Sequence, residues 1–132
     1  MMLTKRELSK YYYLSLEIKD LEERKRMLEQ TSIGSAKLTG MPKAQFNNTS
    51  PTERIIELID EIDKRLDKRK VEAMQEMIKI EKFISEIVDI ETRLIFSKRY
   101  IELKGWEKIG EEMHMSKRTA QRIHKKFLEG AN

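Results

Sequence analysis

Apolar residues recur every three or four positions in two long stretches of the chain. Because this spacing places them on one face of a helix, it predicts two long amphipathic helices, from about residue 4 to 30 and from about 51 to 88. The first apolar stripe comprises Tyr11, Leu14, Ile18, Leu21 and Leu28, with Lys25 interrupting, and the second comprises Ile55, Ile59, Ile62, Leu66, Ala73, Met77, Ile80, Ile84 and Ile87. Neither helix can bury its stripe alone, so we expect an antiparallel hairpin, a dimer, or both.

The starts of both helices carry capping signals. Thr4 is followed three residues later by Glu7, and Ser50 is followed by Pro51 and Glu53, a capping box with proline at the first helical position. Residues 31–50 between them contain two glycines, a proline and many Ser, Thr and Asn residues, which predicts a loop.

A third, shorter helix is expected after Asp89, whose carboxylate can cap its start. Its apolar positions are Leu94, Ile95, Phe96, Tyr100, Ile101 and Leu103. We expect Gly105 to end this helix in the left-handed conformation that glycine adopts without strain.

Two amphipathic segments close to the C-terminus have the pattern of a helix-turn-helix. Residues 106–112 and 117–128 predict two short helices, and Ser116 is placed to cap the second. Five apolar residues fall where two crossing helices share a core, namely Ile109, Met113, Met115, Ala120 and Ile123. Gly110 is expected where the crossing is tightest, and Trp106 is expected to fill the junction between helices.

Charge is distributed unevenly along the chain. The net charge is +4, but residues 93–132 hold ten Lys or Arg and five Asp or Glu, so the whole positive excess lies in the last third. On the second short helix, Lys117, Arg118, Gln121 and Arg122 could read bases in a major groove. Ser116, Thr119, Lys125 and Lys126 are expected nearer to phosphate. Glu107, Glu111 and Glu112 fall on the preceding helix, away from DNA.

The segment RYIELKGWEKIGEEMHMSKRTAQRIHKKFL resembles the region-four helix-turn-helix of bacterial sigma factors. It is similar, more closely, to a phage and prophage family of ArpU/RinA-like late transcription regulators. The matching residues are Arg99, Tyr100, Glu102, Trp106, Glu107, Ile109, Glu111, Ser116, Arg118, Arg122, Ile123, His124 and Lys125. The resemblance implies a DNA-binding transcription regulator. Gly110 and His114 depart from the family, where alanine and a Gly or Asn are usual.

Other functional classes find little support in the sequence. There is no cysteine, and His114 and His124 lie ten residues apart with no third ligand at a suitable spacing, so no metal site or cofactor is expected. No catalytic constellation appears, so an enzyme is not expected. No run of about 18 apolar residues predicts a membrane span, and the N-terminal segment lacks a signal-peptide core, which favours a cytoplasmic protein.

The sequence therefore predicts an all-α protein. Residues 1–88 are expected to form a long helical hairpin or coiled-coil arm, and residues 89–132 a helix-turn-helix domain. The expected partners are double-stranded DNA, a second copy of the chain through the long helices, and RNA polymerase as a further candidate. The competing hypothesis is a helical interaction protein that binds RNA polymerase or a phage assembly component without reading DNA.

We also expect Met74, Met77, Met113 and Met115 to fill apolar stripes, and at least one of Tyr11, Tyr12 and Tyr13 to face the seam between the long helices.

Overall fold

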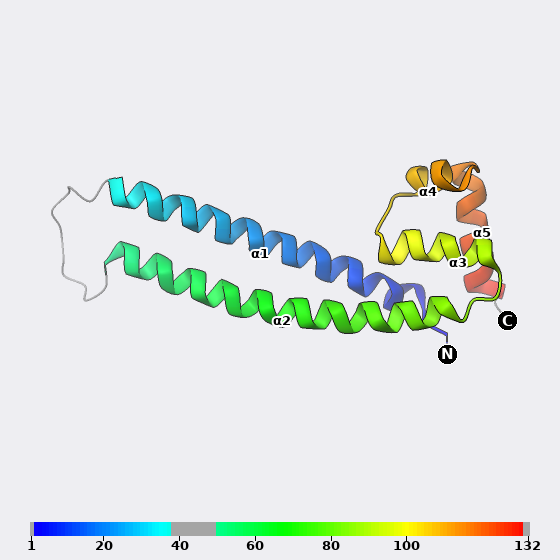
Figure 1. Cartoon of the computed structure of the whole chain (residues 1–132), viewed down its shortest axis with the longest axis horizontal. Helices are drawn as coiled ribbons and strands as arrows, with labels where there is room; N and C mark the ends of the chain where they lie inside the picture. Colours follow the sequence, from blue (N-terminus) through cyan, green and yellow to red (C-terminus); the bar gives the residue numbers. More distant parts are fainter. Residues whose placement is uncertain (1, 38–49, 131–132) are drawn as a thin grey trace. The chain divides into compact units, whose positions relative to one another are not determined.

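The computed structural model describes residues 2–37 and 50–130, and these residues form helices and short connections without a strand (Figure 1). The elements in chain order are α1 (Lys5–Lys37), α2 (Pro51–Ser85), α3 (Ile90–Phe96), the π-helix η1 (Ser97–Ile101), α4 (Trp106–Met113) and α5 (Lys117–Gly130). The expected all-α class is confirmed. Among the described residues, no helix combines the length and the apolar character needed to cross a bilayer.

The long helices begin where the sequence places their caps. The backbone N–H of Glu7 donates to Thr4 Oγ1 at 3.1 Å, and the Glu7 carboxylate accepts from the Thr4 N–H at 2.9 Å, which completes a reciprocal capping box. This bonding holds the pKa of Glu7 below its usual value. Ser50 caps α2 in the same way, because the Glu53 N–H donates to its hydroxyl at 3.0 Å.

The predicted loop at residues 31–50 begins too early. Helix α1 continues to Lys37, and Thr31 donates its hydroxyl to the Met27 carbonyl at 2.9 Å within the helix. A threonine hydroxyl can donate a hydrogen bond to the carbonyl one turn back without breaking a helix. Thr31 therefore does not end α1, although it is polar and β-branched. The rest of the predicted loop, residues 38–49, lies outside the described residues.

The chain divides into two compact units, and both long helices contribute to each. Unit 1 comprises Met1–Leu14 and Glu72–Asn132, and unit 2 comprises Ser15–Val71. The predicted domain boundary at residue 88 falls inside unit 1. Packing explains this, because the N-terminal turns of α1 and the C-terminal turns of α2 share a core with the shorter helices.

Unit 2 is a pairing of two helix segments around a narrow apolar seam. Leu21, Ile62 and Leu66 are buried, with Ile18 and Leu28 packed against them. Ion pairs flank the seam where the apolar stripes are interrupted: Lys25 Nζ lies 2.9 Å from Asp63, and Arg69 Nε lies 3.0 Å from Glu17. The hydrogen bond to Asp63 raises the pKa of Lys25. Exposed ion pairs of this kind add little stability.

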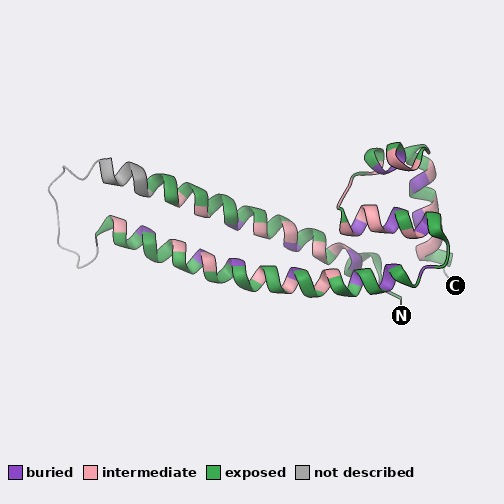
Figure 2. Cartoon of the chain, in the orientation of Figure 1, coloured by how far each residue is buried: buried purple, intermediate pink, exposed green. Residues whose placement is uncertain are grey.

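Unit 1 has a larger core that is built from several elements (Figure 2). Its buried residues are Leu3, Leu8, Ile80, Phe83, Ile84, Ile87, Phe96 and Tyr100, and partly buried Tyr11, Ile101, Phe127 and Leu128 pack against them. The predicted stripe of the second long helix is confirmed at Ile80 and Ile84. Ile87 is also buried, but it lies beyond α2, which ends at Ser85 and not at about residue 88 as predicted. Tyr11 is half-buried and Tyr13 is exposed, so one tyrosine of the three meets the core, as expected.

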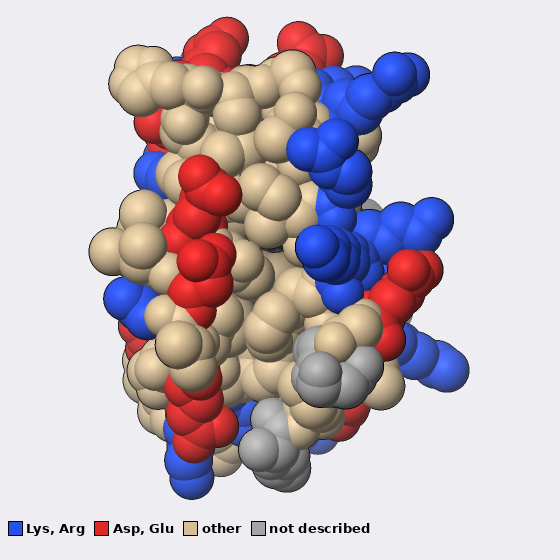
Figure 3. Space-filling model, turned by 90° about the vertical axis from the view of Figure 1, so that its right-hand side faces the viewer, with Lys and Arg blue, Asp and Glu red and all other residues tan. Residues whose placement is uncertain are grey.

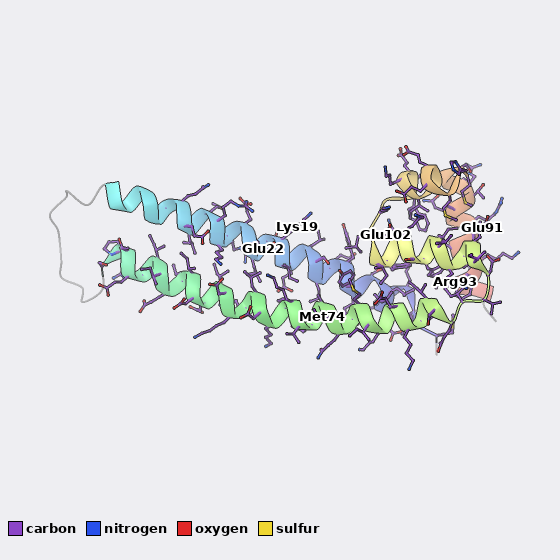
Figure 4. The ribbon with its side chains drawn as sticks, in the orientation of Figure 1. Lys19, Glu22, Met74, Glu91, Arg93 and Glu102 are labelled. Atoms are coloured by element: carbon purple, nitrogen blue, oxygen red, sulfur yellow. The ribbon has the colours of Figure 1, made fainter. Side chains whose placement is uncertain are left out.

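Met74 is an exception to the expected core methionines. Its side chain is 63% exposed on α2 (Figure 4), whereas Met77, Met113 and Met115 are half-buried. The reason is angular, because Ala73, Met77 and Ile80 follow the buried face and Met74 lies about 100° around the helix from Ala73.

The connection from α2 to α4 begins as the sequence predicts. Asp89 caps α3 as expected, accepting from the Thr92 N–H at 2.9 Å and from the Thr92 hydroxyl at 2.8 Å. These hydrogen bonds lower the pKa of Asp89. Arg93 Nη1 donates to the Ile87 carbonyl at 2.8 Å, which ties α3 back to the segment that follows α2; Figure 4 labels Arg93 on α3.

The left-handed residue expected at Gly105 is instead Leu103, with φ 59°. Gly105 has φ −74° and ψ 163°, an extended conformation, and serves as the N-cap of α4. The π-helical turn accounts for the shift: Glu102 N–H bonds to the Ser97 carbonyl at 3.0 Å and Lys104 N–H to the Lys98 carbonyl at 2.9 Å, so the turn closes two residues earlier.

The turn between α4 and α5 requires a small residue on α4. A Cβ added to Gly110 would lie 2.7 Å from the Met115 carbonyl oxygen and 3.2 Å from the Lys117 nitrogen. The carbonyl of Gly110 accepts a hydrogen bond from the Met115 N–H at 2.9 Å, and His114 is left-handed with φ 56°. This is a Schellman ending, and it confirms the expected tight approach at Gly110.

We predict that Gly110→Ala lowers the free energy of unfolding by about 1 kcal/mol. Alanine contributes about 1 kcal/mol of helix propensity, but overpacking against rigid backbone costs about 1–3 kcal/mol. Urea denaturation measures the difference. Gly130→Ala is the matched control, since a Cβ at Gly130 meets nothing within 4 Å. A Gly110→Ala protein as stable as the Gly130→Ala protein contradicts the prediction.

Candidate nucleic-acid interface

Helices α4 and α5 form the expected helix-turn-helix around a small core. Ile109 of α4 and Ala120 of α5 are fully buried, and Ile95 of α3 joins them. Trp106, Met113, Met115 and Ile123 pack against this cluster, as predicted from their spacing. The contribution of Ile95 was not expected, because nothing in a linear pattern shows which face of α3 meets the later helices.

Ser116 caps α5 as predicted. Its Oγ accepts from the Thr119 N–H at 3.0 Å and donates to Thr119 Oγ1 at 2.8 Å. The two hydroxyls therefore share one hydrogen bond, which leaves one hydroxyl proton of the pair for another acceptor. Ser116 is exposed and Thr119 is half-buried.

The other residues expected to contact DNA share one solvent-facing side of α5. Exposed there are Lys117, Arg118, Gln121, Arg122, Lys125 and Lys126, while Ala120 and His124 on the opposite side are buried. None of the five cations forms an ion pair with another described residue. Their charges are thus available to an external polyanion.

Acidic and basic side chains are unevenly distributed on this face. Figure 3 shows most Lys and Arg side chains of the view along one side and a row of Asp and Glu side chains toward the other, and each side also carries some side chains of the opposite charge. On α4, Glu112 is neutralised by Lys98 and Lys104, whose Nζ atoms each lie 2.7 Å from its carboxylate. The hydrogen bonds from Lys104 and Lys98 lower the pKa of Glu112 to about 2. Glu107 and Glu111 are exposed on α4 and not on α5, as expected.

A buried aromatic junction fixes the inner side of α5. His124 Nε2 lies 2.6 Å from the Tyr100 hydroxyl, and its ring stacks on Phe96 with the centroids 5.0 Å apart. Trp106 meets the same imidazole edge-on at 4.9 Å. His124 therefore belongs to the core, where it packs among aromatic rings.

Burial sets the protonation state of this pair. Desolvation, with smaller contributions from the charges of Lys5 and Arg99, lowers the pKa of His124 to about 4. Desolvation raises the pKa of Tyr100 to about 12. Both rings are therefore neutral near pH 7, and the phenol can donate to an imidazole that carries its proton on Nδ1.

Arg99 was not among the residues predicted to contact DNA. Its guanidinium lies 4.8 Å from the Trp106 ring centroid and donates to the Lys104 carbonyl at 3.1 Å. In the sequence, Arg99 lies between Lys98 and Tyr100 and looks like one more basic residue. A helical-wheel projection could not have placed it correctly, because the π-helical turn changes the angle between successive side chains.

We predict that His124 makes the free energy of unfolding depend on pH between about 6.5 and about 4. The unfolded pKa is near 6.5 and the folded pKa is lower, so the unfolded chain binds more protons in this window. This stability is fully present above pH 6.5 and falls as the pH drops, by roughly 3–4 kcal/mol in total at about 1.4 kcal/mol per pKa unit.

Urea midpoints measured across this range test the assignment. In His124→Gln, the part of the slope of stability against pH that the imidazole causes should disappear. The control is His114→Asn, which replaces the exposed histidine at a left-handed position that asparagine tolerates and should keep this slope. Equal slopes in the wild type and His124→Gln would show that another group titrates.

Comparison of the chain with models of protein families, with curated proteins and with solved structures gives no match. We therefore infer the function from the geometry of α4 and α5 and from the charges that α5 exposes.

Proposed function

We propose that the protein is a phage-type transcription regulator that binds duplex DNA by placing α5 in the major groove. This proposal is based on the combination of an inner face held by Ala120 and His124 with an outer face of cations that form no ion pair with another described residue. The major groove is about 12 Å wide and admits one α-helix, and Arg, Lys and Gln donors match guanine and adenine edges there.

The roles within α5 follow from exposure and position. Lys117, Arg118, Gln121 and Arg122 lie in its first two turns, the part of a recognition helix that meets base edges. Lys125, Lys126 and the Thr119 hydroxyl would contact phosphates. Glu112, once neutralised by two lysines, adds little negative potential to oppose this approach.

A single small module of this kind binds weakly, so we include self-association through the long helices in the proposal. Four apolar side chains of α2 are at least half exposed: Ile56, Val71, Met74 and Ile78. A second copy that covers them would present two recognition helices to two half-sites.

A second candidate function is supported by a different surface. Val88, Ile90 and Leu94 around the start of α3 are 94%, 62% and 45% exposed. Adjacent exposed apolar residues favour a protein contact. In this alternative the protein is an interaction partner of RNA polymerase or of a phage assembly component and does not read DNA.

Salt dependence of duplex binding separates the two functions. We expect log affinity to fall linearly with log salt concentration at a slope near −4, because about four to five phosphates would be neutralised. Fluorescence anisotropy of a labelled duplex measures it. Absence of a complex at low salt favours the protein-partner function.

We predict that Arg122→Ala weakens binding to a selected specific site by about 1–3 kcal/mol, the range for loss of a bidentate contact to guanine. Sites selected from random duplexes provide the probe. Arg24→Ala removes an exposed arginine of α1 in unit 2 and should leave affinity unchanged. Equal affinities for Arg122→Ala and Arg24→Ala would remove Arg122 from base recognition.

A further inference from the structure

A cleft of about 380 Å³ lies in unit 1 beside the cationic face of α5. Three elements bring a positive charge to it: Lys5 from α1, Arg99 from η1 and Lys125 from α5. One carboxylate, that of Glu129, is also at its rim. Three cations against one anion leave a net positive cleft, which suits an anionic group.

The cations of the cleft are positioned differently. Arg99 is held in place, because it lies over the Trp106 ring and donates to the Lys104 carbonyl. A guanidinium has five N–H donors, so this single bond leaves others for a ligand. Lys5 and Lys125 are exposed and can adjust. The rigid donor fork of Arg matches the geometry of a phosphate, and the flexible stem of Lys lets its charge approach the same group.

The cleft is continuous with the surface assigned to DNA. Gln121 and Lys125 belong to both, since each is exposed on α5 and each lines the cleft. A helix inserted in the major groove is bordered on both sides by sugar-phosphate backbone, so the flank of α5 is where a backbone phosphate passes.

We propose that this cleft binds a phosphate of the DNA backbone, with Lys5 and Arg99 as contacts outside the helix-turn-helix. The inference rests on the proposed function and extends it, because α1 then takes part directly in DNA binding. Arg99 and Lys5 both lie close enough to His124 to affect its titration, which supports their convergence on one side of α5.

Lys5→Gln is the most informative variant. Lys5 is exposed at the first residue of α1, where a positive charge is unfavourable to the helix dipole, so its loss should not reduce stability. Lys82→Gln is the matched control, because Lys82 is also exposed in unit 1 but does not line this cleft. Thermal melting followed by circular dichroism checks both folds.

Duplex binding against salt gives the main readout. We expect the Lys5→Gln slope to be less negative than that of the wild type by about 0.9, the value for one phosphate contact, and the Lys82→Gln slope to equal the wild-type slope. Wild-type binding with an unchanged Lys5→Gln slope overturns this inference and leaves the proposed function standing. Failure of the wild type to bind duplex overturns the proposed function itself.

Trp106 distinguishes DNA from a free anion as the source of the phosphate. It is the sole tryptophan of the chain, and it lines the cleft, so its fluorescence reports on occupation. We expect duplex to change this emission, and inorganic phosphate at matched ionic strength to change it little. Saturable binding of inorganic phosphate that duplex cannot displace would overturn the assignment to DNA.

Discussion

The buried contact of His124 with Phe96 and Tyr100 is the interaction on which the proposed interface depends. It fixes the rotation of α5 about its own axis, because a polar ring that is stacked on one neighbour and hydrogen-bonded to another has few alternative positions. With that side held, Arg122, Lys125 and Lys126, which are one or two residues from His124 and lie about 100–160° around the helix from it, face solvent. A histidine in the core thus determines which side chains are available for binding.

The turn before α5 contributes a second constraint. Gly110 allows the backbone of Met115 to approach closely, and the left-handed His114 closes α4 with two hydrogen bonds. These bonds define where α5 begins, and the Ser116 cap then satisfies an amide at its first turn. The turn therefore sets the residue at which α5 begins, and the aromatic junction sets the rotation of α5 about its own axis.

Charge separation within unit 1 follows from the same packing. Lys98 and Lys104 reach the carboxylate of Glu112 because the π-helical turn brings their backbone beside α4. The acid most embedded in this region is thereby compensated within the protein. The cations of α5 have no such partner among the described residues, and their uncompensated charge is the main electrostatic feature of this surface.

Much of the local structure was determined by the sequence alone. Periodic apolar residues and the caps at Thr4, Ser50, Asp89 and Ser116 specified where helices begin and which faces are buried, because these effects act over one or two turns. Thr31 shows the limit, since polar composition suggested a loop where the helix continues to Lys37.

Only the tertiary structure decided which distant segments meet. Lys5 and Lys125 are far apart in the sequence and line one cleft, and the division into units cuts across both long helices. The left-handed residue is Leu103, whereas the sequence predicted Gly105. The reason is a π-helical turn, which no residue pattern predicted and which shortens the connection. Such outcomes depend on how whole helices pack, and that packing is a sum over many weak contacts that no single position encodes.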